Sequence, residues 1–271
     1  MKHSKIIIAS IFILALQVNS LAQKAKDFPA NPKVIKKNSS QITDLLYASK
    51  VEVTNKNYSY FILDLQQNSE TKKLKTAIID SNQWVGDFYN LPYVKHYHTH
   101  KAYGAYPVVN ISYEGAVLYC EWLTKKYNSN PKRKFQKVIF RLPTEKEWVN
   151  AAKAGNKKAI YPWDGDSMRT ENGSYRANFR RSDKPDSNST EENSINISIL
   201  TPVYAYWPNE LDIYNMSGNA AEMIQEKGTS KGGGFLDYEE GMKIASKGEY
   251  SLTSTGQVTL GFRWFMEILE H

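Results

Sequence analysis

Three groups of side chains in this sequence could take part in chemistry, and the first is a histidine triplet. His96, His98 and His100 alternate with other residues in the run HYHTH. In an extended segment alternate side chains point to the same side, and three imidazoles on one side could bind zinc or a similar metal. Surface histidines gathered by chance are the simpler interpretation of the same run.

The second group is acidic and follows three consecutive glycines. Asp237, Glu239 and Glu240 lie in the segment 230–265, which closes on the sequence LGFRWF. These carboxylates could belong to an altered catalytic site, although three acids in a loop are more simply explained as a solvated surface.

The third candidate is Cys120, the only cysteine of the chain. A helix is expected after Ser112, a plausible N-cap, and its apolar face would consist of Ala116, Val117, Cys120, Leu123 and Tyr127. A thiol buried in such a face usually behaves as an inert small hydrophobe rather than as a nucleophile. A single cysteine also excludes an internal disulfide.

Two further helices are predicted by periodicity and capping residues. Thr54 can cap a helix whose apolar side chains include Tyr58, Phe61, Ile62 and Leu65. The strand KVIFR leads into a second helix, opened by the capping box of Thr144 and Glu147 and ended by Gly155.

The chain after Gly155 shows little periodicity. It is rich in Gly, Asn, Ser and aromatic residues, and residues 182–198 form an unpatterned polar loop. Long irregular segments in compact domains are usually functional, ion-bound or disordered. Together with the predicted helices and strands, this pattern indicates an α+β fold with much irregular structure.

The composition allows a packed core and argues against nucleic-acid binding. Hydrophobic residues make up 41% of the chain, which has 18 Tyr and 6 Trp. The net charge of +7 is spread over scattered lysines. Within the main basic cluster, residues 125–137, the aromatic residues are Tyr127 and Phe135, and they do not alternate with basic residues as in a stacking platform for nucleic acids. A solvated basic face, or a face for an acidic partner, accounts for the charge.

The N-terminus has the pattern of a secretory signal peptide. Lys2 and Lys5 precede an apolar run from Ile6 to Val18, and small residues end at Ala22. The run is shorter than the roughly 20 residues of a membrane-spanning helix. We therefore expect residues 1–22 to be a signal peptide, 23–43 an extended segment and 44–271 the folded domain. The mature protein would be exported, periplasmic or outer-membrane-associated, without a transmembrane segment.

Seven motifs in a fixed order resemble one known family. They are EVTNKNY, YPVVNISYEGAVLYCEW, RLPTEKEW, YRANF, IYNMSGNAAEM, KGGGF and LGFRWF. This series resembles the formylglycine-generating enzyme (sulfatase-modifying factor) domain, a distant relative of the C-type lectin fold, over residues 44–267.

One segment resembles a narrower branch of that family. The sequence DSNQWVGDFYNLPYVKHYHTHKAYGAYPVV is similar to the gliding-motility and type IX secretion lipoproteins GldK and GldJ. The resemblance implies envelope proteins of a secretion or motility complex as partners. The chain departs from this branch because it lacks the lipoprotein cysteine and is shorter.

The resemblance also bears on catalysis. Active members of the family carry two copper-binding cysteines between the glycine-rich motif and the GFR motif, and soft Cu(I) prefers thiolates. Residues 230–265 contain no cysteine. We therefore expect no copper and no catalysis, and predict a non-catalytic scaffold or interaction protein of the cell envelope. The alternatives are a metal-dependent oxidoreductase of altered chemistry, at the histidines or the acids, and a glycan-binding module.

Finally, the resemblance implies structural calcium. The matching positions of a first site are Asn215, Gly218, Ala220 and Glu222, where side-chain oxygens and backbone carbonyls would bind the ion. A turn capped by Asn215 without an ion is the alternative. A second site would start at Asn178 and Phe179. Its expected aspartate is missing, and Asn196, Asp183 or Asp186 could replace it.

Overall fold

The computed structural model describes residues 27–85, 91–181, 199–251 and 256–271. The expected signal peptide and the polar loop 182–198 lie outside these ranges. The described helices are α2 (Pro32–Lys37), α3 (Asn55–Gln67), α4 (Thr71–Ala77), α5 (Leu91–His96), α6 (Tyr113–Asn128) and α7 (Glu145–Lys153), with 3-10 turns η1 (Ser81–Trp84), η2 (Lys101–Tyr103) and η3 (Glu239–Met242). None of these helices has the length and hydrophobicity that crossing a bilayer requires.

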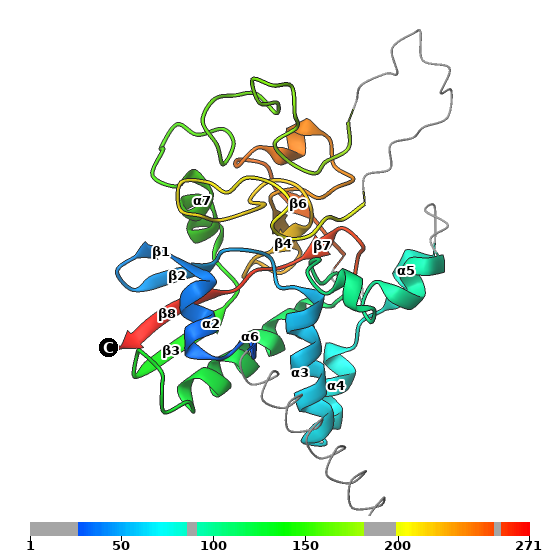
Figure 1. The fold of residues 1–271 in the computed structure, drawn as a ribbon, viewed down its shortest axis with the longest axis vertical. Helices are drawn as coiled ribbons and strands as arrows, with labels where there is room; N and C mark the ends of the chain where they lie inside the picture. The colour runs from blue at the N-terminus through cyan, green and yellow to red at the C-terminus, as the bar shows by residue number, and fades with distance from the viewer. Residues whose placement is uncertain (1–26, 86–90, 182–198, 252–255) are drawn as a thin grey trace, which may run out of the picture.

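Two small sheets organise the chain (Figure 1). The first has the order β1-β2-β8-β3 and is antiparallel throughout. The second has the order β6-β5-β4-β7, in which β4 and β7 pair in parallel. The strands are β1 (Ser39–Thr43), β2 (Leu46–Ser49), β3 (Lys137–Arg141), β4 (Ala221–Met223), β5 (Thr229–Lys231), β6 (Gly248–Glu249), β7 (Leu260–Gly261) and β8 (Phe265–Glu270).

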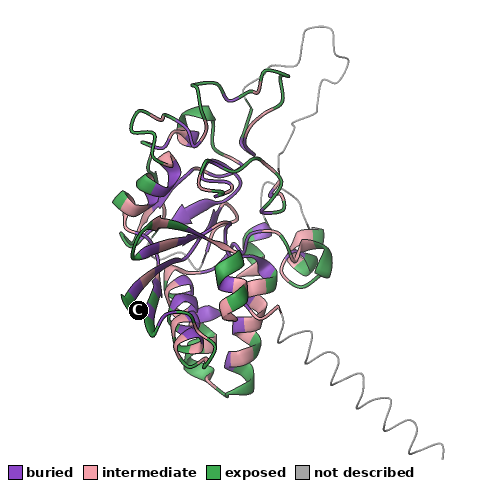
Figure 2. Ribbon diagram, turned by 60° about the vertical axis from the view of Figure 1, so that its left-hand side comes forward, coloured by how far each residue is buried: buried purple, intermediate pink, exposed green. Residues whose placement is uncertain are grey.

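The main core lies between helices α3 and α6 and the first sheet. Aromatic rings pack edge to face or stack across it, with Tyr58, Phe61, Tyr119 and Phe262 all at most 1% exposed. Figure 2 shows the buried faces of the helices turned toward the strands. Since edge-to-face aromatic pairs add to the free energy of burial, this cluster fixes how the two helices sit on the sheet.

The three helix starts predicted from capping residues are confirmed. The Thr54 side chain accepts a hydrogen bond from the Asn57 amide, and Ser112 accepts one from Gly115. Thr144 and Glu147 form both bonds of the capping box. Helix α7 ends one residue earlier than expected, because Ala154 itself adopts the left-handed conformation at φ 46° before Gly155 at φ 90°.

Residues 23–43 differ from the extended conformation expected of them. Their described part contains helix α2 and strand β1, and β1 pairs with β2 at the edge of the first sheet. Pro32 is at the first helical position, where its fixed φ and missing N–H cost nothing, and Asn31 caps the helix. Ile35 anchors α2 to the core at 4% exposure.

The irregular middle of the chain agrees with the sequence pattern. Between Lys153 and Ala221 the described residues form no helix or strand of more than an isolated bridge. Described backbone groups of this region pair instead in turns or through single bonds between distant segments, for example the Asn219 amide with the Asn178 carbonyl at 2.8 Å. The fold is thus α+β with a large irregular portion, as predicted.

Candidate functional site

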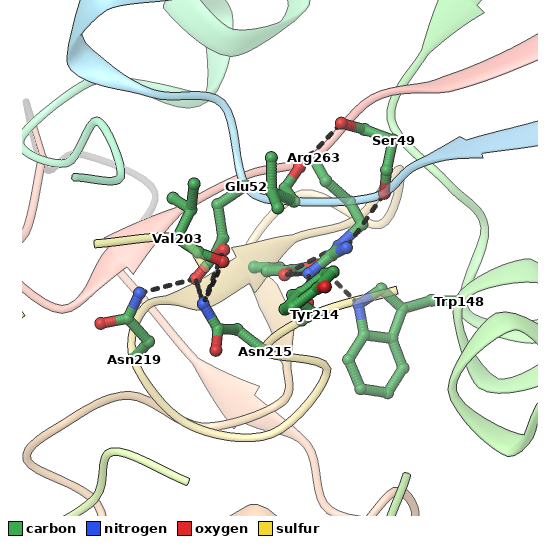
Figure 3. Close-up of polar contacts among 10 residues, drawn as sticks. Ser49, Glu52, Trp148, Val203, Tyr214, Asn215, Asn219 and Arg263 are labelled. Carbon is green, nitrogen blue, oxygen red and sulfur yellow. Dashed lines mark hydrogen bonds and ion pairs between the residues drawn. The ribbon is translucent and has the colours of Figure 1, made fainter. Parts of the chain in front are cut away.

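A buried polar centre joins three segments that are far apart in the sequence (Figure 3). Arg263 follows β7, Glu222 lies in β4, and Glu52 lies between β2 and α3. The parallel pairing of Glu222 with Gly261 brings the first two together. All three side chains are at most 1% exposed.

Arg263 and Glu222 form an ion pair with several hydrogen bonds. The Arg263 Nε atom lies 2.9 and 2.7 Å from the two carboxylate oxygens, and Nη2 lies 2.5 Å from Oε1. Trp148 donates its indole N–H to Oε2 at 2.8 Å. Nη1 donates to the carbonyl of Ser49 at 3.0 Å and Nη2 to that of Tyr214 at 2.8 Å, so that each nitrogen of the buried guanidinium has a partner in the protein.

Glu52 is the second carboxylate of this centre. It accepts hydrogen bonds from the side-chain amides of Asn215, at 3.2 and 3.1 Å, and of Asn219, at 2.8 Å. Burial raises the pKa of Glu52 from 4.5 to about 7, although the nearby Arg263 opposes the shift. Glu222 thus forms the ion pair with Arg263, while Glu52 lies near that cation and accepts its hydrogen bonds from neutral amides.

The loop 215–219 that carries the predicted calcium residues has an unusual backbone. Asn215, Gly218 and Asn219 all have positive φ, at 52°, 80° and 67°. A Cβ on Gly218 would lie 2.5 Å from the Asn178 carbonyl oxygen, so only glycine fits there. Ala220 follows at 1% exposure.

Asn215 and Glu222 do not fit a cation in this arrangement. Both oxygens of Glu222 already accept hydrogen bonds from Arg263 or Trp148, and Asn215 turns its N–H groups toward Glu52. A cation needs oxygen lone pairs, and binding here would require the ion pair with Arg263 to open. These bonds argue against the calcium that the family resemblance implies at Asn215 and Glu222, and chelation would decide the question.

The residues of the second predicted calcium site adjoin the first. The Asn178 side chain donates to the carbonyl of Ile199 at 2.8 Å and to Asn219 Oδ1 at 3.3 Å. Phe179 is buried and packs edge to face on Tyr175. The replacement ligands considered for this site, Asp183, Asp186 and Asn196, lie outside the described residues.

The histidine triplet does not have the extended geometry expected of it. His96 ends helix α5, and His98 and His100 lie in the turn that follows, so the alternating pattern does not apply. The His98 ring bonds to Asn55 at 2.9 Å, and burial lowers the pKa of His98 to about 3. Within the part of the chain that is described, no three His, Cys, Asp or Glu side chains are placed to hold a metal.

The three acidic side chains after the glycine run also interact with separate partners. Asp237 accepts from the Gly234 amide at 2.7 Å, Glu240 pairs with Lys243 at 2.6 Å, and Glu239 accepts from Tyr161 at 3.4 Å. Cys120 is 2% exposed, as predicted, and burial raises the pKa of its thiol.

Sequence reasoning missed four residues of the polar core. Glu52, Arg263 and Trp148 complete the centre, and Lys231 is fully buried against the Trp148 ring, 3.6 Å from Glu145. A signal was present for two of them. Glu52 stands between two valines and Arg263 between Phe262 and Trp264, and a charge enclosed by apolar neighbours indicates a paired interior group.

Comparison with known proteins identifies a family over most of the chain and individual relatives over up to half of it. Residues 29–268 match the sulfatase-modifying factor enzyme 1-like domain family. The formylglycine-generating enzyme of Thermomonospora curvata is 34% identical over 117 residues, which are 43% of this chain and 32% of that protein. The inactive C-alpha-formylglycine-generating enzyme 2 of Bos taurus is 28% identical over 145 residues, 50% of this chain and 40% of that protein. The chain therefore spans less than half of the relatives it matches.

Solved structures with the same fold confirm the predicted fold class. CarF is 22% identical, with a TM-score of 0.52 over 82% of this chain and 86% of that one. PvdO from Pseudomonas aeruginosa is 17% identical, with a TM-score of 0.53 over 82% of this chain and 80% of that one. At these identities the likeness concerns the fold alone.

Proposed function

Because the chain belongs to the sulfatase-modifying factor enzyme 1-like domain family, we propose that it is a non-catalytic member that serves as an interaction scaffold in the cell envelope. The observation that carries this proposal is the burial of its single thiol. Cys120 is the only cysteine, and it is 2% exposed among apolar side chains. A buried thiol with a raised pKa supplies neither a nucleophile nor a soft metal ligand.

The family itself supports a role without catalysis. It includes proteins that are described as inactive, such as the bovine relative. In this chain the acids of the glycine-rich segment bond to neighbouring groups and do not converge among the described residues. These observations support a chain that has the fold of the family but no catalytic site formed by these acids.

The surface of the irregular portion suits an interaction role. Tyr204, Trp207 and Tyr238 are exposed at 52%, 58% and 51%. Tyr and Trp are enriched among the residues that dominate binding energy at protein interfaces. The proposed partners are envelope proteins of a secretion or gliding-motility complex, which is the branch that residues 80–109 resemble.

An activity assay tests the absence of catalysis. The purified protein, supplied with Cu(I), is incubated with a cysteine-containing peptide that the Thermomonospora curvata relative converts, and the peptide is analysed by mass spectrometry for an aldehyde. We expect conversion by that relative and none by this chain. Conversion here would overturn the proposal, and a Cys120→Ser variant would show whether the buried thiol takes part.

A further inference from the structure

Two adjoining hollows are lined in part by helix α2, which is blue in Figure 1. Their volumes are about 550 and 900 Å³. Val34, Lys37, Asn38, Lys56 and Asn57 line both of them. Because the same residues line both, the two hollows adjoin, and we call them together the α2 groove.

The α2 groove carries an excess of positive charge. Five lysines line it, namely Lys33, Lys37, Lys50, Lys56 and Lys132, together with two aspartates, Asp27 and Asp212. Each aspartate neutralises one lysine, at 3.0 Å for Lys56 with Asp27 and 2.5 Å for Lys50 with Asp212.

The other three lysines are available to a ligand. Lys33, Lys37 and Lys132 are exposed, and none of them forms an ion pair within the described residues. Three unpaired ammonium groups along one groove attract an acidic ligand and repel a basic one.

The rest of the lining distinguishes between kinds of acidic ligand. The first hollow is lined by the partly exposed Val34 and Tyr214 and by Tyr204, which is 52% exposed. Its lining also includes the buried Val51, Val203 and Trp264. The described residues that line the second hollow include no aromatic side chain but do include Asn31 and Asn130. Nucleic acids and sugar chains pack their rings on aromatic side chains, which only the first hollow offers. A polypeptide needs an apolar anchor, charge complementarity and amide groups for its backbone, and the groove supplies all three.

We propose that the α2 groove binds an extended acidic segment of a partner protein, with an apolar residue of that segment against Val34 and Tyr204. The inference rests on the proposed scaffold role and names the kind of partner that this role requires. Lys33, Lys37 and Lys132 would bind carboxylates of the segment, so that binding weakens as salt concentration rises.

Fluorescence anisotropy with a defined pair of peptides tests the groove. The probes are two labelled twelve-residue peptides with one central Trp, identical except that one carries Glu wherever the other carries Gln. We expect the full chain to bind the Glu peptide at least about tenfold more tightly than the Gln peptide. The triple variant Lys33→Glu, Lys37→Glu, Lys132→Glu should lose this preference.

A matched control changes the same charge elsewhere. Lys146→Glu, Lys157→Glu and Lys158→Glu replace three exposed lysines that do not line the groove, and this variant should bind the Glu peptide as the wild type does. Equal affinity for the two peptides, equal losses in both triple variants, or tighter binding of polygalacturonate than of the Glu peptide would each overturn the assignment.

Affinity purification from envelope extracts separates this inference from the scaffold role. If a stoichiometric partner is captured by the wild type and lost only with the groove variant, both proposals are supported. If the groove variant captures the same partner equally well, the scaffold role stands and the groove assignment is overturned. If the wild type captures no partner, the scaffold role fails, and the groove assignment that rests on it fails too.

Discussion

Arg263 is the residue whose charge the buried centre depends on. It bonds to Glu222 and to two backbone carbonyls while fully removed from water. Replacing it in Arg263→Met would leave Glu222 and Glu52 buried without a cation. We expect a loss of about 3–5 kcal/mol in the free energy of unfolding, measured by urea denaturation.

An exposed ion pair provides the control for this loss. Lys50 pairs with Asp212, whose side chain is 54% exposed, and Lys50→Met should cost less than about 1 kcal/mol. Similar losses for the two variants would mean that the Arg263 pair contributes no more than a surface pair.

Glu52 makes stability depend on pH. Its pKa of about 7 in the folded protein lies above its ordinary value of 4.5, so the folded state holds the proton more tightly. Its contribution to stability is therefore complete below pH 4.5 and is lost as the pH rises to about 7.

The variant Glu52→Gln keeps an oxygen for Asn215 and Asn219 and cannot ionise. Relative to the wild type, we expect it to gain on the order of 1–3 kcal/mol between about pH 5 and pH 8, measured by urea unfolding at each pH. A constant difference between the two proteins across this range would show that Glu52 titrates normally.

At the level of elements, the loop 215–219 depends on close approach of two backbone segments. Gly218→Ala adds a Cβ only 2.5 Å from the Asn178 carbonyl oxygen, at a positive φ. We expect a loss of more than about 2 kcal/mol, from backbone strain together with the clash.

Gly155 separates these two causes. Its φ of 90° is close to the 80° of Gly218, but a Cβ there meets no atom within 4 Å. Gly155→Ala should therefore show the strain alone, about 1 kcal/mol, in the same unfolding measurement. If both variants lose the same amount, the contact with Asn178 does not constrain the loop.

The same loop carries the calcium prediction, which chelation tests. With Glu222 held by Arg263 and Trp148, we expect excess chelator to leave the melting temperature of the wild type unchanged. A lower melting temperature, restored by added calcium, would show instead that the ion pair opens to admit the ion that the family resemblance implies.

Local elements could be predicted from the sequence because their signals are local. The caps Thr54, Ser112 and Thr144 and the apolar periodicity after them specify α3, α6 and α7. Helix α2 and strand β1 could not, since Lys-rich residues with two prolines have no clear period. Their conformation follows from pairing with β2 and from burial of Ile35.

The sequence marks Glu52 and Arg263 as interior charges, but local patterns do not predict which side chains they contact. Glu222 was singled out, but as a calcium ligand, because its partner depends on the parallel pairing of β4 with β7. Glu52 joins Arg263 and Glu222 only when three distant segments meet. The prediction that the three histidines share one face was wrong. An alternating pattern places side chains on one face only in a strand, whereas these residues form a helix end and a turn.

At the scale of the whole molecule, the core, the ionic centre and the exposed surface all bear on the proposed interaction role. A packed aromatic core and a bonded ionic centre hold an irregular portion whose surface exposes Tyr204 and Trp207, and the basic α2 groove lies beside Tyr204. This surface, together with the burial of the only thiol, supports the proposed role of binding a partner.

Native co-purification tests this account most directly. The chain is tagged after His271, which is exposed, the envelope is solubilised mildly, and the proteins that accompany it are quantified by mass spectrometry. The account predicts a stoichiometric complex with envelope proteins that persists through a sizing step. A lone monomer, with no protein enriched over an untagged control, would contradict it.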